Sequence, residues 1–113
     1  MPIDKKLISG NTSMLLLQLL SEKDMYGYEM IETLEQRSHS VFQLKAGTLY
    51  PLLHTLEAQK HLTAYEKEIQ GKVRRYYRIT KEGRKALDKK KEEWSDYAEA
   101  VSQVIGGTAY VNG

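Results

Sequence analysis

Apolar residues recur at helical spacing in three stretches before residue 60. The first stretch is centred on residues 14–20, with the polar residues 11–13 available as an N-cap. The second starts near Asp24 and ends before the polar run 36–40. The third is the clearest, because its leucines fall at i, i+3, i+4 and i+7 and form one stripe: Leu49, Leu52, Leu53 and Leu56. The pattern predicts three helices, the third with a buried leucine face.

Beyond the third helix the period changes from helical to alternating. Residues 62–69 and 72–80 read as two strands joined at Gln70-Gly71, where glycine supplies a positive φ. Alternation puts Arg74, Tyr76 and Arg78 on one face of the second strand, with Arg75 on the other. The pattern predicts a β-hairpin whose second strand interleaves basic and aromatic side chains.

A long C-terminal helix is expected over residues 81–105, capped by Thr80. At ~1.5 Å per residue it is about 37 Å long, more than a domain of this size covers by itself. Its seam positions are spaced 4, 3, 4, 3 and 4: Leu87, Lys91, Trp94, Ala98, Val101 and Ile105. A second copy of the chain covers such a seam; the alternative is a helix folded back on its own domain. Residues 106–113 are expected to be a disordered tail.

The order of these elements predicts an α+β fold that is mainly α with a small β-hairpin, a winged helix-turn-helix. Residues 1–80 form the DNA-binding domain in this interpretation, and residues 81–105 form the dimerisation helix, with Leu87, Trp94, Ala98, Val101 and Ile105 at the dimer contact. The third helix is then the one that enters the major groove.

Polar groups gather on the outer face of that third helix and at the hairpin turn. Lys45, Thr48, Tyr50 and His54 are donors able to reach bases or phosphates. Two of them have an alternative interpretation without a DNA contact. Tyr50 would then pack beneath the helix, and His54 would be a solvated surface residue. Cations at the wing tip are expected to meet phosphates or enter a minor groove: Lys72, Arg74 and Arg75. Arg78, further from the tip, covers the hairpin with its aliphatic stem in the simplest interpretation.

The distribution of charge supports an anionic partner although the net charge is only +2. Residues 60–91 contain 12 basic and 4 acidic residues, a net of +8, and the rest of the chain carries −6. A concentrated positive stretch suits a polyanion. The alternative is a solvated basic face without a partner.

Composition narrows the remaining classes. The chain has no cysteine, which excludes disulfides and thiolate metal sites, and its three histidines form no metal-binding pair at i, i+4. We expect no cofactor, no metal and no enzyme activity, because the sequence contains no recognisable pattern of a nucleophile, an acid-base pair or a metal site. The longest apolar run, residues 14–17, is far below the ~20 residues that span a bilayer, and the N-terminus lacks a basic segment leading into an apolar one. We therefore expect a cytoplasmic protein without a membrane partner.

Several local motifs together resemble the PadR-like transcriptional regulators, in particular their short subfamily with a single C-terminal helix. The resemblance extends over roughly residues 7–105 and rests on five segments: YGYE (26–29), GTLYPLL (47–53), LE (56–57), RRYYRIT (74–80) and EG (82–83). It implies a dimeric repressor that binds a partly palindromic operator and releases it on a signal. It also implies DNA contacts from Tyr26, Lys45, Thr48 and Tyr50, with Tyr76 and Tyr77 as anchors of the hairpin.

The resemblance further implies a place for a small ligand. In multidrug-sensing regulators similar to this chain, a tryptophan in the last helix faces its symmetry mate and stacks flat aromatic molecules. Trp94 stands at the matching place, and the expected ligand-lining residues are Met14, Trp94 and Ala98. The alternative is that Trp94 is only a dimer-core residue. Lys90 and Lys91 depart from a purely apolar lining and argue against cationic drugs.

A rival from another class is a winged helix that docks an acidic protein and does not recognise a DNA sequence. Salt separates the two, since DNA binding weakens log-linearly with salt by a slope near 0.9 per phosphate contact. A metal-sensing regulator is a further alternative within the same class.

Overall fold

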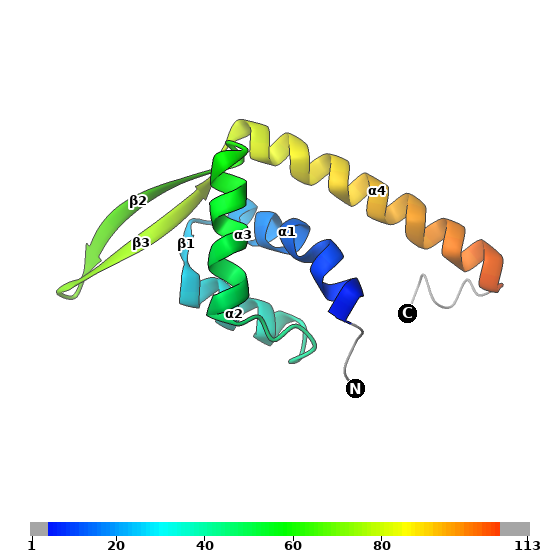
Figure 1. Ribbon diagram of the computed structural model, residues 1–113, viewed down its shortest axis with the longest axis horizontal. Helices are drawn as coiled ribbons and strands as arrows, with labels where there is room; N and C mark the ends of the chain where they lie inside the picture. Colours follow the sequence, from blue (N-terminus) through cyan, green and yellow to red (C-terminus); the bar gives the residue numbers. More distant parts are fainter. Residues whose placement is uncertain (1–4, 107–113) are drawn as a thin grey trace.

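The computed structural model describes residues 5–106, with side chains from residue 11 onward. The predicted α+β order is confirmed (Figure 1) and runs α1 (Lys5–Glu22), β1 (Met25–Tyr26), α2 (Gly27–Arg37), α3 (Ala46–Ala58), β2 (Leu62–Ile69), β3 (Lys72–Ile79) and α4 (Lys81–Ile105). The predicted disordered tail, 106–113, lies outside the described residues except for Gly106. That glycine ends α4 in the left-handed conformation, with φ 77°.

The first helix is longer than its apolar stripe indicated. It begins at Lys5, so the N-cap expected within residues 11–13 is wrong. Thr12 lies four residues before Leu16 on the same helical face, and its side chain is only 2% exposed. A threonine thus occupies a core position in the middle of α1, which made the helix appear to start about two turns late.

The sheet has three strands, one more than expected. The two-residue strand β1 pairs antiparallel with β3, giving the order β1-β3-β2. Helix α2 therefore starts at Gly27, after β1, and not near Asp24 as predicted. Tyr76 in the central strand lies opposite Tyr26 on one side and Tyr65 on the other. A strand of two residues is too short for alternation to reveal, since it contains a single step of the pattern.

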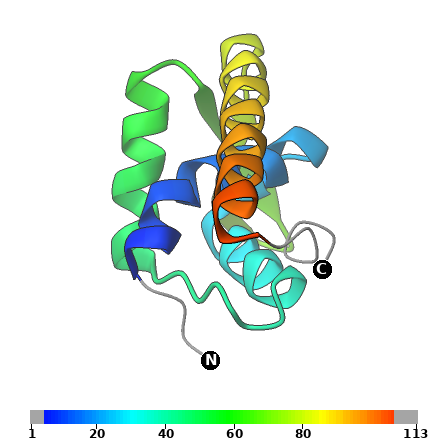
Figure 2. The same ribbon diagram turned by 90° about the vertical axis from the view of Figure 1, so that its right-hand side faces the viewer.

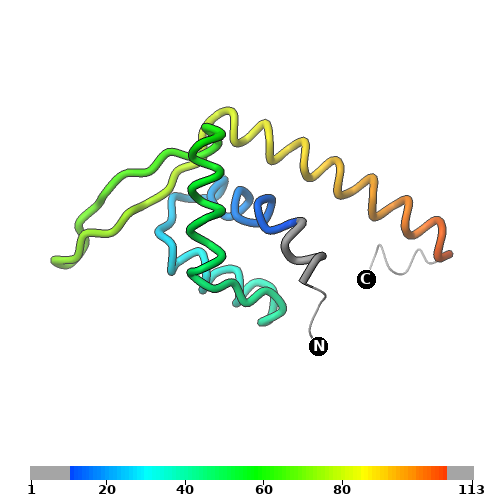
Figure 3. Tube along the Cα trace, in the orientation of Figure 1, coloured from blue at the N-terminus to red at the C-terminus, as the bar shows by residue number. Residues whose placement is uncertain are grey.

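The hairpin between β2 and β3 is confirmed with the predicted turn. Gln70 and Gly71 both have positive φ, 53° and 79°, as a two-residue type I′ turn requires. Such a turn fixes the register, and Lys67 lies opposite Arg74. The two strands run outward together from the helices, while α4 leaves in another direction (Figures 1 and 3).

The core lies among α1, α2, α3 and the inner face of the sheet. The predicted stripe of α3 is confirmed, because Leu49 and Leu53 are fully buried and Leu56 nearly so. Burying a leucine contributes roughly 1.5–3 kcal/mol each. The core residues around that stripe come from every other element: Leu16, Leu17, Leu20, Met25, Met30, Leu34, Leu62, Tyr77, Ile79 and Leu87. The leucine stripe packs one side of α3 against the core, and the opposite side of the helix lies at the surface.

Helix α4 starts against the body and then projects from it (Figure 1); Figure 2 looks roughly along its length. Thr80 caps it as predicted, its hydroxyl accepting a hydrogen bond from the Gly83 amide at 2.9 Å. Gly83 packs so closely on the backbone carbonyl of His61 that a β-carbon would overlap it. None of the helices described is both long and apolar enough to cross a membrane.

Candidate nucleic-acid interface

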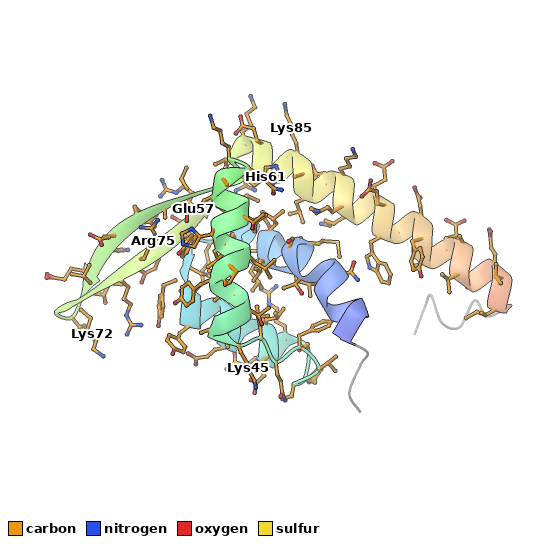
Figure 4. All side chains as sticks on the ribbon, in the orientation of Figure 1. Lys45, Glu57, His61, Lys72, Arg75 and Lys85 are labelled. Carbon is orange, nitrogen blue, oxygen red and sulfur yellow. The ribbon has the colours of Figure 1, made fainter. Side chains whose placement is uncertain are left out.

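The outer side of α3 presents polar and small residues from its first turns. Lys45 is the extended residue that precedes the helix, and both it and Thr48 are exposed. Figure 4 places Lys45 at the start of α3, where backbone N–H groups without helical partners attract anions. His54 is exposed two turns further on. Lys45 and Thr48 thus lie exposed at the N-terminal end of α3, and His54 lies exposed in its second half.

Tyr50 joins α3 to α2 as well as facing solvent. Its side chain lies against Gly27, the first residue of α2, so that a β-carbon there would overlap the phenol hydroxyl. Burial raises the pKa of the Tyr50 hydroxyl, yet the residue remains 39% exposed. The ring therefore packs beside α3 on α2 and not beneath the helix. It can position the two helices of the motif while its exposed edge stays available to a ligand.

The two faces of the hairpin carry opposite charge. On what we call the basic face, three of the four cations lie over tyrosine rings, and the register places residues of the neighbouring strands opposite one another. The residues of this face are the following: Tyr26, Tyr65, Lys67, Lys72, Arg74, Tyr76 and Arg78. The other face, the acidic face, has Glu66 opposite Arg75 and Glu68 opposite Val73. Four of the five cations of the hairpin thus lie on one face of the wing, whereas six other cations of residues 60–91 lie on α4.

Arg74 is held on the basic face by aromatic rings. Its guanidinium carbon lies 4.3 Å from the centre of the Tyr26 ring, and Tyr26 meets Tyr76 edge-on at 5.5 Å. The Lys67 ammonium lies 5.6 Å from the centre of the Tyr76 ring. A guanidinium that lies over a ring face still has N–H groups available for hydrogen bonds. Arg74 is therefore oriented before any phosphate arrives.

A hollow of about 350 Å³ lies at this face, lined by Tyr26, Arg74, Tyr76, Lys72 and the turn residues Ile69 and Gln70. It joins the end of the wing to the start of α2. Figure 4 shows Lys72 at the tip of the hairpin. Lys72, Arg74 and Tyr26, three of the predicted site residues, are thus brought to one surface.

Arg75 is not brought to that surface. Its guanidinium forms an ion pair with Glu57 of α3 at 3.2 Å, and Figure 4 shows both beside the C-terminal part of α3. The expected trio of wing-tip cations is therefore split, with Arg75 on the acidic face and tied to the body. Lys67, which was not among the predicted site residues, lies opposite Arg74 on the basic face.

Arg78 contributes to the base of the hairpin. It pairs with Asp24 at 2.9 Å, and Tyr65 donates a hydrogen bond to the same carboxylate at 2.6 Å. Burial alone would raise the pKa of Asp24, but the hydrogen bonds from Tyr65 and Arg78 outweigh it and lower the pKa. Arg78 is thus more than a cover for the hairpin, since it fastens the wing to the residue before β1.

A second hollow, of about 330 Å³, lies where α4 crosses α1. Met14 and Trp94 line it as expected, together with Leu15, Gln18 and Lys91; Ala98 is half-buried and is not part of this lining. The Lys91 ammonium donates to the Gln18 side-chain oxygen at 3.2 Å. Gln18 donates in turn to Glu22 at 3.0 Å.

Glu22 continues this polar connection into the helix-turn-helix. Its carboxylate pairs with Arg37 at the end of α2. Hydrogen bonds from Arg37 and Gln18 lower the pKa of Glu22 to about 2. Side chains of α4, α1 and α2 are thus linked in one hydrogen-bonded series.

The outer half of α4 exposes an apolar stripe that differs in part from the predicted seam. Leu87 is buried in the core of its own chain and is not at the surface. Trp94, Val101 and Ile105 are exposed as a seam requires, and two further exposed residues that the sequence reasoning missed accompany them: Tyr97 and Val104. Among the described residues, no group of three metal-ligating side chains comes together.

Comparisons with known proteins agree with this architecture. The family model described as "Transcriptional regulator PadR-like family" matches residues 16–89. The chain is 32% identical to the transcriptional regulator Rv3488 of Mycobacterium tuberculosis, over 87% of this chain and 86% of that one. An uncharacterized protein of Lysinibacillus sphaericus is 34% identical, over 89% and 94%.

Solved structures share the same fold. A transcriptional regulator from Clostridium thermocellum superimposes with a TM-score of 0.83 at 33% identity, covering 89% of this chain and 96% of that one. A PadR family transcriptional regulator from Eggerthella lenta gives 0.79 at 32% identity, covering 88% and 86%. The three helices, the sheet and the hairpin are therefore a winged helix of the kind found in DNA-binding regulators.

Proposed function

Because the chain belongs to the PadR-like family of transcriptional regulators, whose winged helix binds DNA, we propose that it is a homodimeric repressor of a partly palindromic operator. In this proposal residues 1–80 bind DNA and residues 81–105 pair two copies of the chain. A small planar aromatic molecule or another signal releases the operator. Such a regulator acts in the cytoplasm, where it meets the DNA.

The observation that carries the proposal is the continuity of the outer side of α3 with the basic face of the hairpin. Tyr50 of α3 contacts Gly27, and the ring of the preceding residue, Tyr26, lies under Arg74 of the wing. With α3 in the major groove, its donors meet base edges and phosphates, and the basic face meets the adjacent backbone. The proposed DNA contacts are Tyr26, Lys45, Thr48, Tyr50, His54, Lys67, Lys72 and Arg74. Arg75, which pairs with Glu57, positions the wing.

Dimerisation through α4 accounts for the exposed apolar stripe of its outer half. Trp94, Tyr97, Val101 and Val104 follow at spacings of 3, 4 and 3, the pattern by which helices pair. A two-fold axis along α4 presents two copies of α3 to two half-sites, which lie ~34–36 Å apart on one side of DNA. The same pairing closes the hollow beside Trp94, where Trp94 offers a flat apolar surface and Met14 a flexible apolar wall to an aromatic effector.

A fluorescence-anisotropy titration tests the proposal. The purified protein is titrated against labelled DNA from its own promoter region, at two salt concentrations, with random DNA as competitor. We expect binding that resists the competitor and weakens log-linearly with salt, with a slope of about 0.9 for each phosphate bound. Equal, weak binding to both DNAs would contradict a sequence-specific repressor and favour the docking of an acidic protein.

A further inference from the structure

One acidic side chain lies at the inner end of the basic face of the hairpin. Asp24, the residue before β1, accepts hydrogen bonds from the Tyr65 hydroxyl at 2.6 Å and from the Arg78 guanidinium at 3.0 Å. Tyr65 belongs to β2 and Arg78 to β3, so this carboxylate ties both strands of the hairpin to the body. A carboxylate beside a DNA-binding surface repels phosphate, so Asp24 would weaken DNA binding if charge alone decided its effect.

The aromatic rings of the basic face form a continuous series between this carboxylate and Arg74. The Tyr65 ring stacks on the Tyr76 ring, with centroids 5.8 Å apart and planes inclined by 19°. Tyr76 meets Tyr26 edge-on at 5.5 Å, and the Arg74 guanidinium carbon lies 4.3 Å from the centre of the Tyr26 ring. Each ring contacts the next, and the last one supports a cation. Displacement of Tyr65 would therefore disturb the support of Arg74.

We propose that Asp24 is a positioning residue for DNA binding: by holding both strands of the hairpin it keeps Arg74 oriented for a DNA phosphate. The inference rests on the proposed function, since it requires that the basic face contacts DNA. The hydrogen bonds to Asp24 suit this role, because bonds to a charged acceptor are stronger than bonds between neutral groups. A negatively charged side chain thus favours the binding of a polyanion.

The sign of the effect separates this role from simple electrostatics. Asp24→Ala removes a negative charge and frees the guanidinium of Arg78 to bind a phosphate. If charge alone decided, this variant would bind DNA more tightly and with a steeper dependence on salt. If Asp24 positions the wing, the variant should bind roughly three- to tenfold more weakly, and its salt slope should be lower, because fewer phosphates are then bound.

Two further variants control for unfolding and for charge. Tyr65→Phe removes the donor to Asp24 but keeps the ring that stacks on Tyr76, so it should weaken binding in the same direction, by roughly two- to threefold. Glu66→Gln removes a negative charge from the exposed acidic face of the same hairpin and should not weaken DNA binding. Circular dichroism and urea unfolding establish that each variant is folded.

Anisotropy titrations of the full-length protein compare the variants on promoter DNA and on random duplex DNA at several salt concentrations. A double-mutant cycle with Arg74→Ala tests whether Asp24 acts through Arg74. We expect Asp24→Ala to change the affinity of the Arg74→Ala protein by no more than about twofold, because the cation that Asp24 positions is then absent. A residue that only stabilised the fold would leave the two effects independent.

Three results would overturn the inference: tighter binding by Asp24→Ala, unchanged binding by this variant, or losses that multiply in the double variant. The last would leave Asp24 as a residue of the fold alone. Equal binding of promoter and random DNA by the wild type would contradict the sequence-specific repressor, but not this inference. Phosphate contacts carry no sequence information, so the variants are then still compared on random DNA.

Discussion

The apolar stripe of α3 and the apolar stripe in the outer half of α4 follow similar helical spacings, but only the first is buried within the chain. Leu49 and Leu53 of α3 are fully buried, whereas Trp94 is 47% exposed and Val104 is 85% exposed. The winged-helix body, from α1 to the first turns of α4, thus completes its own core. The outer half of α4, residues 94–105, does not.

The same apolar pattern can therefore have two structural outcomes. Helical periodicity predicts that one face of a helix is buried, but it does not predict whether the same chain or another molecule buries it. In α3 the neighbours are α1, α2 and the sheet of the same chain. The basic face of the hairpin and the outer half of α4 are both exposed in the single chain. We propose that DNA covers the basic face and that a second copy of the chain covers the outer half of α4.

The largest effect is expected from charging the open stripe. Val101→Glu with Val104→Glu places carboxylates on the proposed seam and should give a monomer whose body is still folded. Because two half-sites then no longer bind as one unit, operator affinity should fall by about 100-fold or more. Sedimentation velocity and a DNA titration measure the two effects.

A matched control places the same charges elsewhere on α4. Ser95→Glu with Gln103→Glu lies on the opposite side of the helix, where both residues are exposed. This variant should remain dimeric and should keep its specificity for the operator. A dimer in the Val101/Val104 variant would mean that the outer half of α4 is not the seam.

The next largest effect is expected on the free energy of unfolding, when a residue of the buried α3 stripe and a residue of the exposed α4 stripe are each truncated. Leu53→Ala removes a fully buried side chain of α3 and should lower the free energy of unfolding by about 2–5 kcal/mol. Ile105→Ala, made in the monomeric variant above, should change it by less than ~0.5 kcal/mol. Urea unfolding followed by circular dichroism measures both. A large loss for Ile105→Ala in the monomer would show that the outer half of α4 packs on its own body.

A similar contrast divides the hairpin, with a smaller expected effect. Arg74→Ala removes an oriented cation from the basic face and should weaken binding to all DNA sequences by roughly tenfold, with the salt slope lower by about 0.9 for each phosphate that the variant no longer binds. Arg75→Ala removes a cation already paired with Glu57 and should leave the salt slope unchanged. Titrations at several salt concentrations decide, and an equal decrease of slope in both variants would refute the division between the faces.

The smallest effect concerns acid stability of the body. Since pairing with Arg37 and Gln18 lowers the pKa of Glu22 from 4.5 to about 2, its carboxylate stabilises the fold above pH 4.5. That contribution should be lost as the pH falls from 4.5 towards 2. Glu22→Gln should make the difference in urea midpoint between pH 7 and pH 3 smaller than in the wild type; an unchanged difference would rule out Glu22 as its source.

Most of the fold could be predicted because its elements are long enough to repeat their pattern. The leucines of α3, the alternation of the hairpin and the seam of α4 each extend over several periods. β1 has two residues and therefore no repeating pattern. In α1, a buried threonine at position 12 interrupts the apolar pattern, so the first turns of the helix were not predicted. These errors come from short or polar segments that tertiary contacts complete.

The site could be predicted in composition but not in arrangement. The type I′ turn at Gln70-Gly71 fixes the register, so Lys67 opposite Arg74 was within reach of the sequence, as was the placement of Arg75 on the other face. The contact of Tyr50 with Gly27 was not, because it depends on how α3 packs on α2. Nor did the spacing on α4 reveal that Leu87 belongs to the body's own core.

Sedimentation equilibrium of the full chain tests the central claim, that the open stripe of α4 is covered by a second copy. We predict a single species of about 26 kDa, twice the 13.0 kDa of the chain, that becomes a monomer on Val101→Glu with Val104→Glu. A mass of 13.0 kDa for the wild type at micromolar concentrations would contradict the claim, and with it the two-half-site account of operator binding.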